Sequence, residues 1–383
     1  MLSIILYLSV FMVCCILIYI TASGRRGNLV ISFGKRKIIS SGKKSGIFLA
    51  LICCIPVILL YGLRTGIGTD YAAYEQIFDI LHDTPFTEYM LLHREGNGAY
   101  YVEAGYYLLN RLLPSYRMLL FADIILILVP AWTAVWELKE NGIPQLSLFI
   151  YMCTQFVFAM NGVRFVIALS FILLGFAFLM NGKYIKCMLS IAVAVMFHTS
   201  AAICILFVFL GHFRQRKINI ARDVLFYFLI ITFAYSNQSI VFIISKIPLF
   251  HRYFTKDAYS FSNSMAGSIV WMLHIVPVLL PLLIVCRNKI FRDSRSRLMF
   301  QICMTQIPFR MMGLYNTWFT RLARISQVIE VLFLPYMLRA VENKNTRRLL
   351  TFYYVMWYIF YFCYYVFVND QGDSIPYRWI LSR

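Results

Sequence analysis

Long apolar stretches alternate with short polar gaps along most of the chain. A helix that crosses a bilayer needs about 20 residues at about 1.5 Å rise per residue. The pattern predicts spans near 2–20, 46–63, 118–136, 145–160, 163–181, 223–245, 269–286, 298–314, 319–338 and 349–368. We therefore expect an all-α, polytopic integral membrane protein, with about 10 transmembrane helices in a single helical membrane domain over 1–383.

The polar gaps differ in charge. The gap from Arg25 to Lys44 holds seven basic residues and no acid, whereas the gap from Arg64 to Arg117 holds seven acids and four bases. Basic loops stay in the cytoplasm, so the first gap is predicted to lie inside and the second outside. This threading also predicts extracytoplasmic termini, including a C-terminal tail over 369–383.

Composition agrees with a membrane protein. Hydrophobic residues make up 61% of the chain and charged residues 14%, against about 25% charged in soluble domains. The net charge of +19 is typical of nucleic-acid binding, but most of the basic residues fall in the predicted cytoplasmic gaps. We therefore expect the lipid bilayer, and no nucleic acid, as a partner.

The apolar run from Cys187 to Gly211 cannot be one simple crossing, because basic gaps of the cytoplasmic type flank it on both sides. Its roughly 24 residues are too few for two full spans of about 20 residues each. The run therefore predicts a re-entrant helical hairpin over 187–211 that turns near Phe197–Ser200. Such a segment is tolerated only where protein or a watery cavity satisfies its backbone.

The large extracytoplasmic loop, 64–117, is predicted to be a structured lid. Asp70 and the preceding threonine form a helix start, and aromatic residues then recur at helical spacing at Tyr71, Tyr74 and Phe78. This spacing predicts an amphipathic helix on the membrane surface, which continues until Gly96–Gly98. A second amphipathic stretch, Tyr101–Leu113, leads into the next span.

Arginine near the outer ends of spans is the strongest chemical signal. Five arginines share this location: Arg64, Arg164, Arg310, Arg321 and Arg324. Each alone is explained by snorkelling to lipid phosphates or by pairing with an acid. Their convergence on one face favours an anionic ligand, because the guanidinium fork matches phosphate oxygens. A lipid-linked phosphate or diphosphate suits a site at this depth.

Other outer residues are candidates for proton transfer and sugar contacts. His198, at the predicted hairpin tip, is either a general acid or base, a phosphate contact, or a structural histidine. Asp70 is either a second candidate base or a helix cap. Four further residues are predicted either to contact sugar or to build the loop: Tyr71, Tyr74, Glu103 and Tyr106.

Known catalytic motifs are missing from the sequence. There is no His-Glu-x-x-His, no Gly-x-x-x-x-Gly-Lys and no Gly-x-Ser-x-Gly. We therefore expect no cofactor and no metal ligands, although a metal site built from scattered outer acids stays open.

Several of these residues also carry a family resemblance. The pieces are Arg64…Gly68-Thr69-Asp70-Tyr71-x-x-Tyr74-x-x-x-Phe78, Glu103-x-Gly105-Tyr106-Tyr107, Asn161-x-x-Arg164, Phe197-His198-x-Ser200-Ala201 and Arg321-x-x-Arg324. In this order and spacing the chain resembles the EpsG family of Wzy-like polysaccharide polymerases, from about residue 55 to 340. One departure is Ala104, where a proline is common, and it affects local geometry alone.

The resemblance implies a GT-C-like polymerase architecture and a glycosyltransferase activity. Family members join undecaprenyl-diphosphate-linked oligosaccharides at the outer face of the bacterial cytoplasmic membrane, making exopolysaccharide, capsule or O antigen. A flippase and a chain-length regulator are compatible partners. The resemblance implies that eight positions match functional residues of the family: Arg64, Asp70, Tyr74, Glu103, Arg164, His198, Arg321 and Arg324.

These readings suggest one mechanism and two alternatives. Arg164, Arg321 and Arg324 would stabilise a leaving diphosphate, with Arg64 and Arg310 in support and His198 or Asp70 as base. A flippase of lipid-linked sugars would instead place polar residues through the bilayer centre. A surface-glycan ligase or acyltransferase could use the same arginines.

Overall fold

The computed structural model describes residues 2–22, 29–33, 36–40, 43–95, 102–139, 142–213, 273–313, 317–367 and 373–380, with single positions at 228 and 246. The predicted span 223–245 lies outside these ranges apart from position 228. In the N-terminal half the helices are α1 (Leu2–Ala22), α2 (Lys43–Cys53), α3 (Ile55–Gly62), α4 (Tyr71–Asp83), α5 (Phe86–Glu95), α6 (Ala104–Leu112), α7 (Tyr116–Glu137) and α8 (Pro144–Ala159). The remaining helices are α9 (Val163–Met180), α10 (Tyr184–Phe197), η3 (Thr199–Ile203), α11 (Cys204–Phe213), α16 (Ile275–Arg292), α17 (Ser294–Met304), α18 (Gln306–Gly313), α19 (Thr317–Gln327), α20 (Glu330–Arg339) and α21 (Lys344–Phe367).

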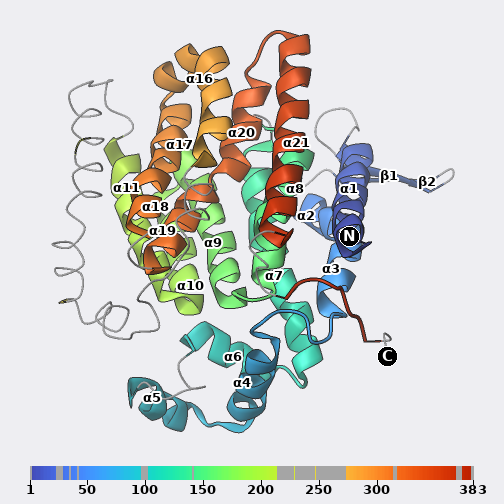
Figure 1. Ribbon diagram of the computed structural model, residues 1–383, viewed down its shortest axis with the longest axis vertical. Coiled ribbons are helices and arrows are strands. Elements are labelled where there is room, and N and C mark those ends of the chain that lie inside the picture. Colours follow the sequence, from blue (N-terminus) through green and yellow to red (C-terminus); the bar gives the residue numbers. More distant parts are fainter. Residues whose placement is uncertain are drawn as a thin grey trace.

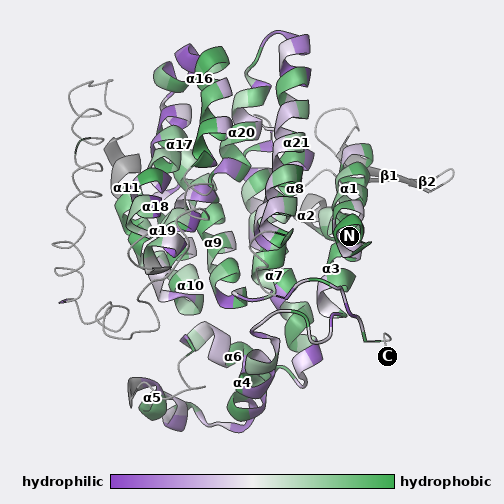
Figure 2. Cartoon of the chain, viewed as in Figure 1, coloured by the Kyte–Doolittle hydropathy of each residue, from purple (hydrophilic) through white to green (hydrophobic). Residues whose placement is uncertain are grey.

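The long helices form a bundle, and α4, α5 and α6 lie across one end of it (Figure 1). Within the described residues, four helices are long and apolar enough to cross a membrane: Leu2–Ile20, Tyr116–Glu137, Val163–Met180 and Lys344–Phe367. Hydrophobic residues dominate α1, α7 and α9, whereas α21 and α4 to α6 are mixed (Figure 2). Large apolar side chains such as Ile185 and Ile284 point outward, 79% and 74% exposed. A surface of this kind suits lipid contact.

One part of the described chain is a β-hairpin. Strands β1 (Leu29–Phe33) and β2 (Arg36–Ser40) pair antiparallel in the basic gap after α1. β-Branched residues favour strands, and each strand contains them. The all-α prediction therefore holds for the bundle, with this small hairpin added to it.

Several predicted spans are interrupted. The span 46–63 divides into α2 and α3 around Cys54, and 298–314 divides into α17 and α18 around Thr305. Pro56 and Pro308 follow these breaks within a turn, and proline removes one hydrogen bond of the helical ladder. The span 319–338 divides into α19 and α20, where the Val331 amide bonds the Val328 carbonyl in a tight i→i+3 turn, 3.2 Å.

The outer loop is also more divided than predicted. One helix was expected to continue to Gly96–Gly98, but α4 ends at Asp83 and α5 begins at Phe86. Thr84 is extended, with φ −73° and ψ 121°, and Pro85 disfavours the helical conformation for the residue before it. Helix α6 matches the second predicted amphipathic stretch.

The predicted chain reversal near His198 is present. Helix α10 runs antiparallel to α9, because Phe197 stacks on Phe171 at 6.2 Å while the start of α10 lies beside Gly175. After the turn, Phe207 of α11 contacts Phe176 at 5.7 Å. The two arms therefore form a hairpin, and the end of α10 next to its tip lies against α6, since a Cβ built on Gly105 would be 2.8 Å from the Met196 carbonyl oxygen.

The tail packs against the start of the chain. The Tyr7 hydroxyl donates to the Ser374 carbonyl at 2.7 Å, and the Tyr377 amide donates to Ser3 Oγ at 2.9 Å. Residue 379 forms an isolated antiparallel bridge with Arg64. Residues 373–380 and the start of α1 therefore lie on the side of the bundle where the outer loop begins.

Candidate active site

The outer loop is fixed to the bundle at its first turn. Gly68 has φ +106°, and a Cβ at this position would lie 2.6 Å from the Met160 carbonyl oxygen. The Thr69 hydroxyl contacts Asn161 Oδ1 at 3.2 Å. Glycine is needed here for both its conformation and its close approach. This packing places Asp70, the N-cap residue of α4, beside the turn that leads into Arg164.

Glu103 connects the outer loop with two other segments. Its Oε2 accepts from Arg164 Nη1 at 2.6 Å, and its Oε1 accepts from the Thr199 backbone amide at 3.3 Å. A short bond between a guanidinium and a carboxylate is a strong, charge-assisted contact. The contact brings together the start of α6, the start of α9 and the hairpin tip.

His198 is buried at the hairpin tip. Its Nδ1 lies 2.7 Å from Ser200 Oγ, and its Nε2 lies 3.4 Å from Arg321 Nη1. Either neutral tautomer leaves one contact unmade, because Nδ1 accepts from the Ser200 backbone amide at 3.3 Å only when the proton is on Nε2, and Nε2 accepts from Arg321 only when the proton is on Nδ1. Burial, followed by the charges of Arg321 and Arg164, lowers the pKa of His198 well below its usual value. The imidazole is therefore neutral at pH 7.

Asp70 shares this electrostatic environment. Partial desolvation raises the pKa of Asp70, while the hydroxyl of Thr69 and the charges of Arg164 and Arg321 act in the opposite direction. Tyr74 is buried beside Arg164. We call the group formed by Asp70, Tyr74, Glu103, Arg164, His198 and Arg321 the outer cluster.

Arg324 lies next to the outer cluster. Its Nη2 donates to the Tyr365 hydroxyl at 2.9 Å, and its guanidinium carbon lies 4.0 Å from the centre of the Phe158 ring. Phe158 contacts Phe165, which contacts His198 at 4.9 Å between ring centres. The two predicted arginines on α19 are therefore connected to the hairpin tip, directly for Arg321 and through aromatic rings for Arg324.

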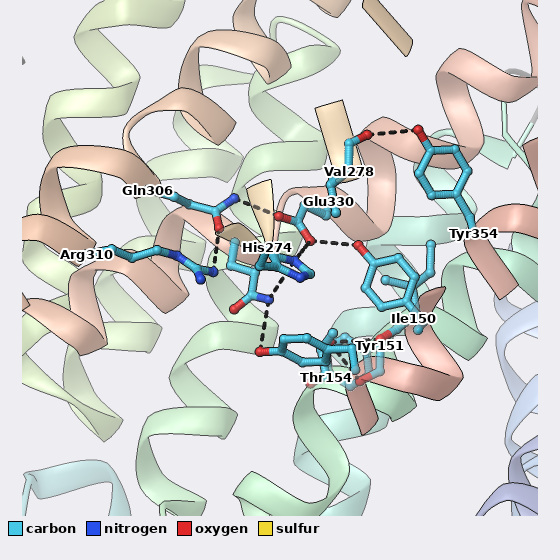
Figure 3. Close-up of polar contacts among 12 residues, drawn as sticks. Ile150, Tyr151, Thr154, His274, Val278, Gln306, Arg310, Glu330 and Tyr354 are labelled. Carbon is cyan, nitrogen blue, oxygen red and sulfur yellow. Dashed lines mark hydrogen bonds and ion pairs between the residues drawn. The ribbon is translucent and has the colours of Figure 1, made fainter. Parts of the chain in front are cut away.

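Arg310 belongs to a different group. Its Nη2 donates to Gln306 Oε1 at 2.9 Å, and Gln306 Nε2 donates to Glu330 Oε1 at 2.7 Å. Figure 3 shows this chain of contacts inside the bundle. Glu330 Oε2 also lies 3.1 Å from His274 Nε2 and accepts from the Tyr358 hydroxyl at 2.7 Å. With Gln327 and Tyr361, which bond each other at 3.3 Å, these residues form what we call the inner network.

The remaining predicted site residues lie elsewhere in the loop packing. Arg64 is 2% exposed, and its guanidinium carbon sits 3.7 Å from the Tyr61 ring centre. Tyr71 packs edge-on against Tyr116, and Tyr106 packs against Tyr74. The structure thus places Arg64 and Tyr71 in the buried layer beneath the loop, whereas Tyr106 borders the outer cluster through Tyr74.

Some polar residues of the two groups were not predicted. Ser200 orients His198, and Gln306, Gln327, Tyr358 and Tyr365 contact charged or polar side chains inside the bundle. Polar amides within apolar spans mark buried contacts, so the two glutamines carried a usable signal. The tyrosines did not, because aromatic residues are abundant throughout these helices.

The fold and the outer cluster define a helical membrane protein with a cationic, carboxylate-flanked site at one end of its bundle. The chain belongs to the EpsG family, which it matches over residues 47–379. No curated protein matches the chain, and no solved structure matches it. Family membership indicates a role in polysaccharide biosynthesis at a membrane, of a polymerase-like and glycosyltransferase-like kind at a coarse level.

Proposed function

We propose that this protein is a Wzy-type polymerase that joins undecaprenyl-diphosphate-linked oligosaccharide repeat units at the outer face of the bacterial cytoplasmic membrane. The observation that carries the proposal is the outer cluster, in which two guanidiniums, a neutral imidazole and two carboxylates converge from distant parts of the chain. Membership in the EpsG family supports a polymer as the product.

The proposed reaction transfers the growing chain from its lipid diphosphate to the next lipid-linked unit. The acceptor hydroxyl oxygen bonds the anomeric carbon, the bond from that carbon to the diphosphate oxygen breaks, and the lipid diphosphate leaves. Arg164, Arg321 and Arg324 stabilise the negative charge on the leaving group. His198, neutral and with Nε2 toward Arg321, takes the acceptor proton, with Asp70 as the alternative base.

The reaction is proposed to need no metal ion. Arginines in fixed positions stabilise developing phosphate charge as a divalent cation does in other enzymes. Among the described residues there is no group of three or more His, Cys, Asp or Glu side chains placed to hold a metal. Metal independence itself stays a prediction, tested by chelation below.

The proposed membrane topology keeps about ten spans, the re-entrant hairpin and both termini outside. The packing of the tail and the start of α1 beside the outer loop supports a common side for all three. Tags at Lys35 and Glu95 should be reachable from the cytoplasm and from outside, respectively. Labelling of Lys183 and Arg216 on opposite sides of the membrane would exclude the re-entrant hairpin.

The glycan ladder of the cell surface tests the proposed function. Cells without this protein should accumulate single lipid-linked repeat units, and wild-type protein should restore polymers of graded length. Arg339→Lys, on the exposed end of α20, should restore them equally. If graded polymers persist without the protein but remain attached to lipid, the ligase assignment replaces the polymerase.

A further inference from the structure

The tail of the chain pairs with the segment that leads into the outer loop. We call residues 62–68 the loop root and residues 373–380 the tail strap. Three backbone hydrogen bonds join them: the Thr65 amide to the Arg378 carbonyl at 3.1 Å, the Ile380 amide to the Leu63 carbonyl at 3.1 Å, and the Gly68 amide to the Asp373 carbonyl at 3.3 Å. The strap therefore satisfies backbone polar groups along most of the root.

The tail strap has anchors of its own on the bundle. It is held to α1 by Tyr7 and Ser3. The Tyr377 hydroxyl also donates to the Leu60 carbonyl of α3 at 2.8 Å, and the rings of Tyr7 and Tyr377 pack edge to face with 5.9 Å between their centres. Because these contacts fix the strap to α1 and α3, the strap can in turn hold the root.

Arg117 of α7 holds the opposite edge of the loop root. Its Nη1 donates to the carbonyls of Gly62 and Arg64 at 2.8 and 2.6 Å, and its Nη2 donates to the Thr65 hydroxyl at 3.2 Å. Successive residues of an extended segment turn their backbone groups to opposite edges, so the Arg64 carbonyl faces Arg117 while residues 63 and 65 face the strap. The root is therefore held from two sides, by one guanidinium and by a strand-like pairing.

The loop root leads directly to Asp70. This residue is exposed, and its carboxylate contacts the hydroxyl of the adjacent Thr69 at 3.4 Å, so the course of the backbone decides where the carboxylate lies. The charges of Arg164 and Arg321 act on it, which places it at the edge of the outer cluster. Gly68 and Thr69 touch the bundle just before Asp70. The hydrogen bonds on both edges of the root keep these two residues in register with the bundle.

We propose that Arg117 and the tail strap form a two-sided clamp on the loop root, and that this clamp positions Asp70 at the outer cluster for glycosyl transfer. The inference rests on the proposed function, because it gives Asp70 a task in that reaction, either as base or as acceptor of a hydrogen bond from the acceptor hydroxyl. Arg117 and the strap are positioning groups, which act on the reaction through Asp70.

Hydrogen exchange of the purified full chain in detergent tests the clamp itself. Ile380→Pro removes the amide that bonds the Leu63 carbonyl, whereas Ile380→Ala keeps that amide and is the matched control. Arg117→Lys keeps the charge but cannot hold three oxygens with one fork. Exchange in the peptide 63–70 should quicken in Ile380→Pro and in Arg117→Lys, and by roughly 10-fold or more in the double variant, while the peptide 163–180 keeps the wild-type rate. Unchanged exchange in the double variant would overturn the clamp.

Polymer synthesis tests the action through Asp70. The double variant should lose turnover roughly 10-fold, while its affinity for farnesyl diphosphate, a lipid diphosphate without sugar, stays within about twofold of wild type. The affinity is kept because Arg164 and Arg321 lie on the bundle helices α9 and α19. Asp70→Asn should lower turnover by a similar factor, and the clamp substitutions should lower it no further in that protein.

Two results would overturn the proposal. Full turnover in the double variant would show that the clamp does not serve the reaction. An equal further loss when the clamp substitutions are added to Asp70→Asn would show that they act on the fold as a whole. A wild-type protein that makes no polymer would instead refute the proposed function, and the clamp would then stand or fall by its hydrogen exchange.

Discussion

The outer cluster and the inner network use the same kinds of side chain for different purposes. In the outer cluster the Arg164 side chain is 25% exposed and its carboxylate partner comes from a separate loop. In the inner network the Glu330 side chain is 1% exposed and contacts Gln306, His274 and Tyr358. The outer cluster is partly open to solvent, at Asp70 and Arg164, whereas Glu330 at the centre of the inner network is closed off by its partners.

The difference separates binding from folding. The hydrogen bonds between a buried carboxylate and its several polar partners are stronger in a low dielectric than in water. They fix how the helices that carry these groups pack. A partly exposed ion pair between segments can exchange its partner for a ligand at lower cost. We therefore expect changes in the inner network to reduce the amount of folded protein, and changes in the outer cluster to reduce activity.

Loss of Glu330 should have the largest effect. Glu330→Ala leaves the His274, Gln306 and Tyr358 polar groups buried without their acceptor, which should lower the free energy of unfolding by about 3–5 kcal/mol. Thermal unfolding in detergent and the yield of monodisperse protein measure this. Glu88→Ala on exposed α5 should change the same quantities little. Comparable stability of the two variants would remove the distinction between the regions.

Replacing arginine by lysine should reduce activity next. Arg164→Lys and Arg324→Lys keep the charge but lose the guanidinium fork. If each arginine contributes a bond that strengthens in the transition state, polymerisation should fall roughly 10²–10³-fold, or about 2–4 kcal/mol, with yield near wild type. Full activity of both variants would make these arginines lipid anchors.

The two histidines give a paired test. His198→Gln should lower turnover by roughly 10²-fold or more while the protein stays folded and binds lipid diphosphate. His274→Gln should instead lower the free energy of unfolding by about 1–3 kcal/mol, because Glu330 loses a buried partner. Normal polymer length in His198→Gln at normal yield would transfer the role of base to Asp70.

The smallest effect is expected at Asp70. Because the pKa of Asp70 is raised in the folded chain, its protonated form stabilises the fold at low pH, and this contribution is lost as pH rises through the folded pKa. Asp70→Asn should therefore be slightly more stable than wild type at neutral pH, by at most about 0.5 kcal/mol, with no difference in acid. Melting curves across pH measure this. A wild-type advantage at pH 7 would mean that the ionised carboxylate is held by its arginines.

Much of the local structure could be predicted from the sequence. The start of α4 after Gly68, the turn at His198 and the shared face of Arg321 and Arg324 all follow from short-range spacing. Helix starts, turns and helical faces depend on neighbouring residues, so local patterns are sufficient to find them.

Contacts between distant segments could not be predicted in this way. Glu103 meets Arg164 across 61 positions of sequence, and Arg310 bonds Gln306, which in turn bonds Glu330. The prediction grouped Arg64 and Arg310 with Arg164, Arg321 and Arg324 because all five lie near the outer ends of spans. The rotation of each helix decides which side chains converge, and span boundaries do not fix that rotation.

The central claim is that the outer cluster joins lipid-linked repeat units without a metal, and reconstitution tests it most directly. Purified protein given undecaprenyl-diphosphate-linked repeat units in EDTA should form longer lipid-linked chains and release one undecaprenyl diphosphate for each bond formed. Abolition of elongation by EDTA, with recovery in magnesium or manganese, would contradict the metal-free account and point to Asp70 and Glu103 as ligands. Translocation of the repeat units without any new glycosidic bond would contradict the assignment of the protein as an enzyme.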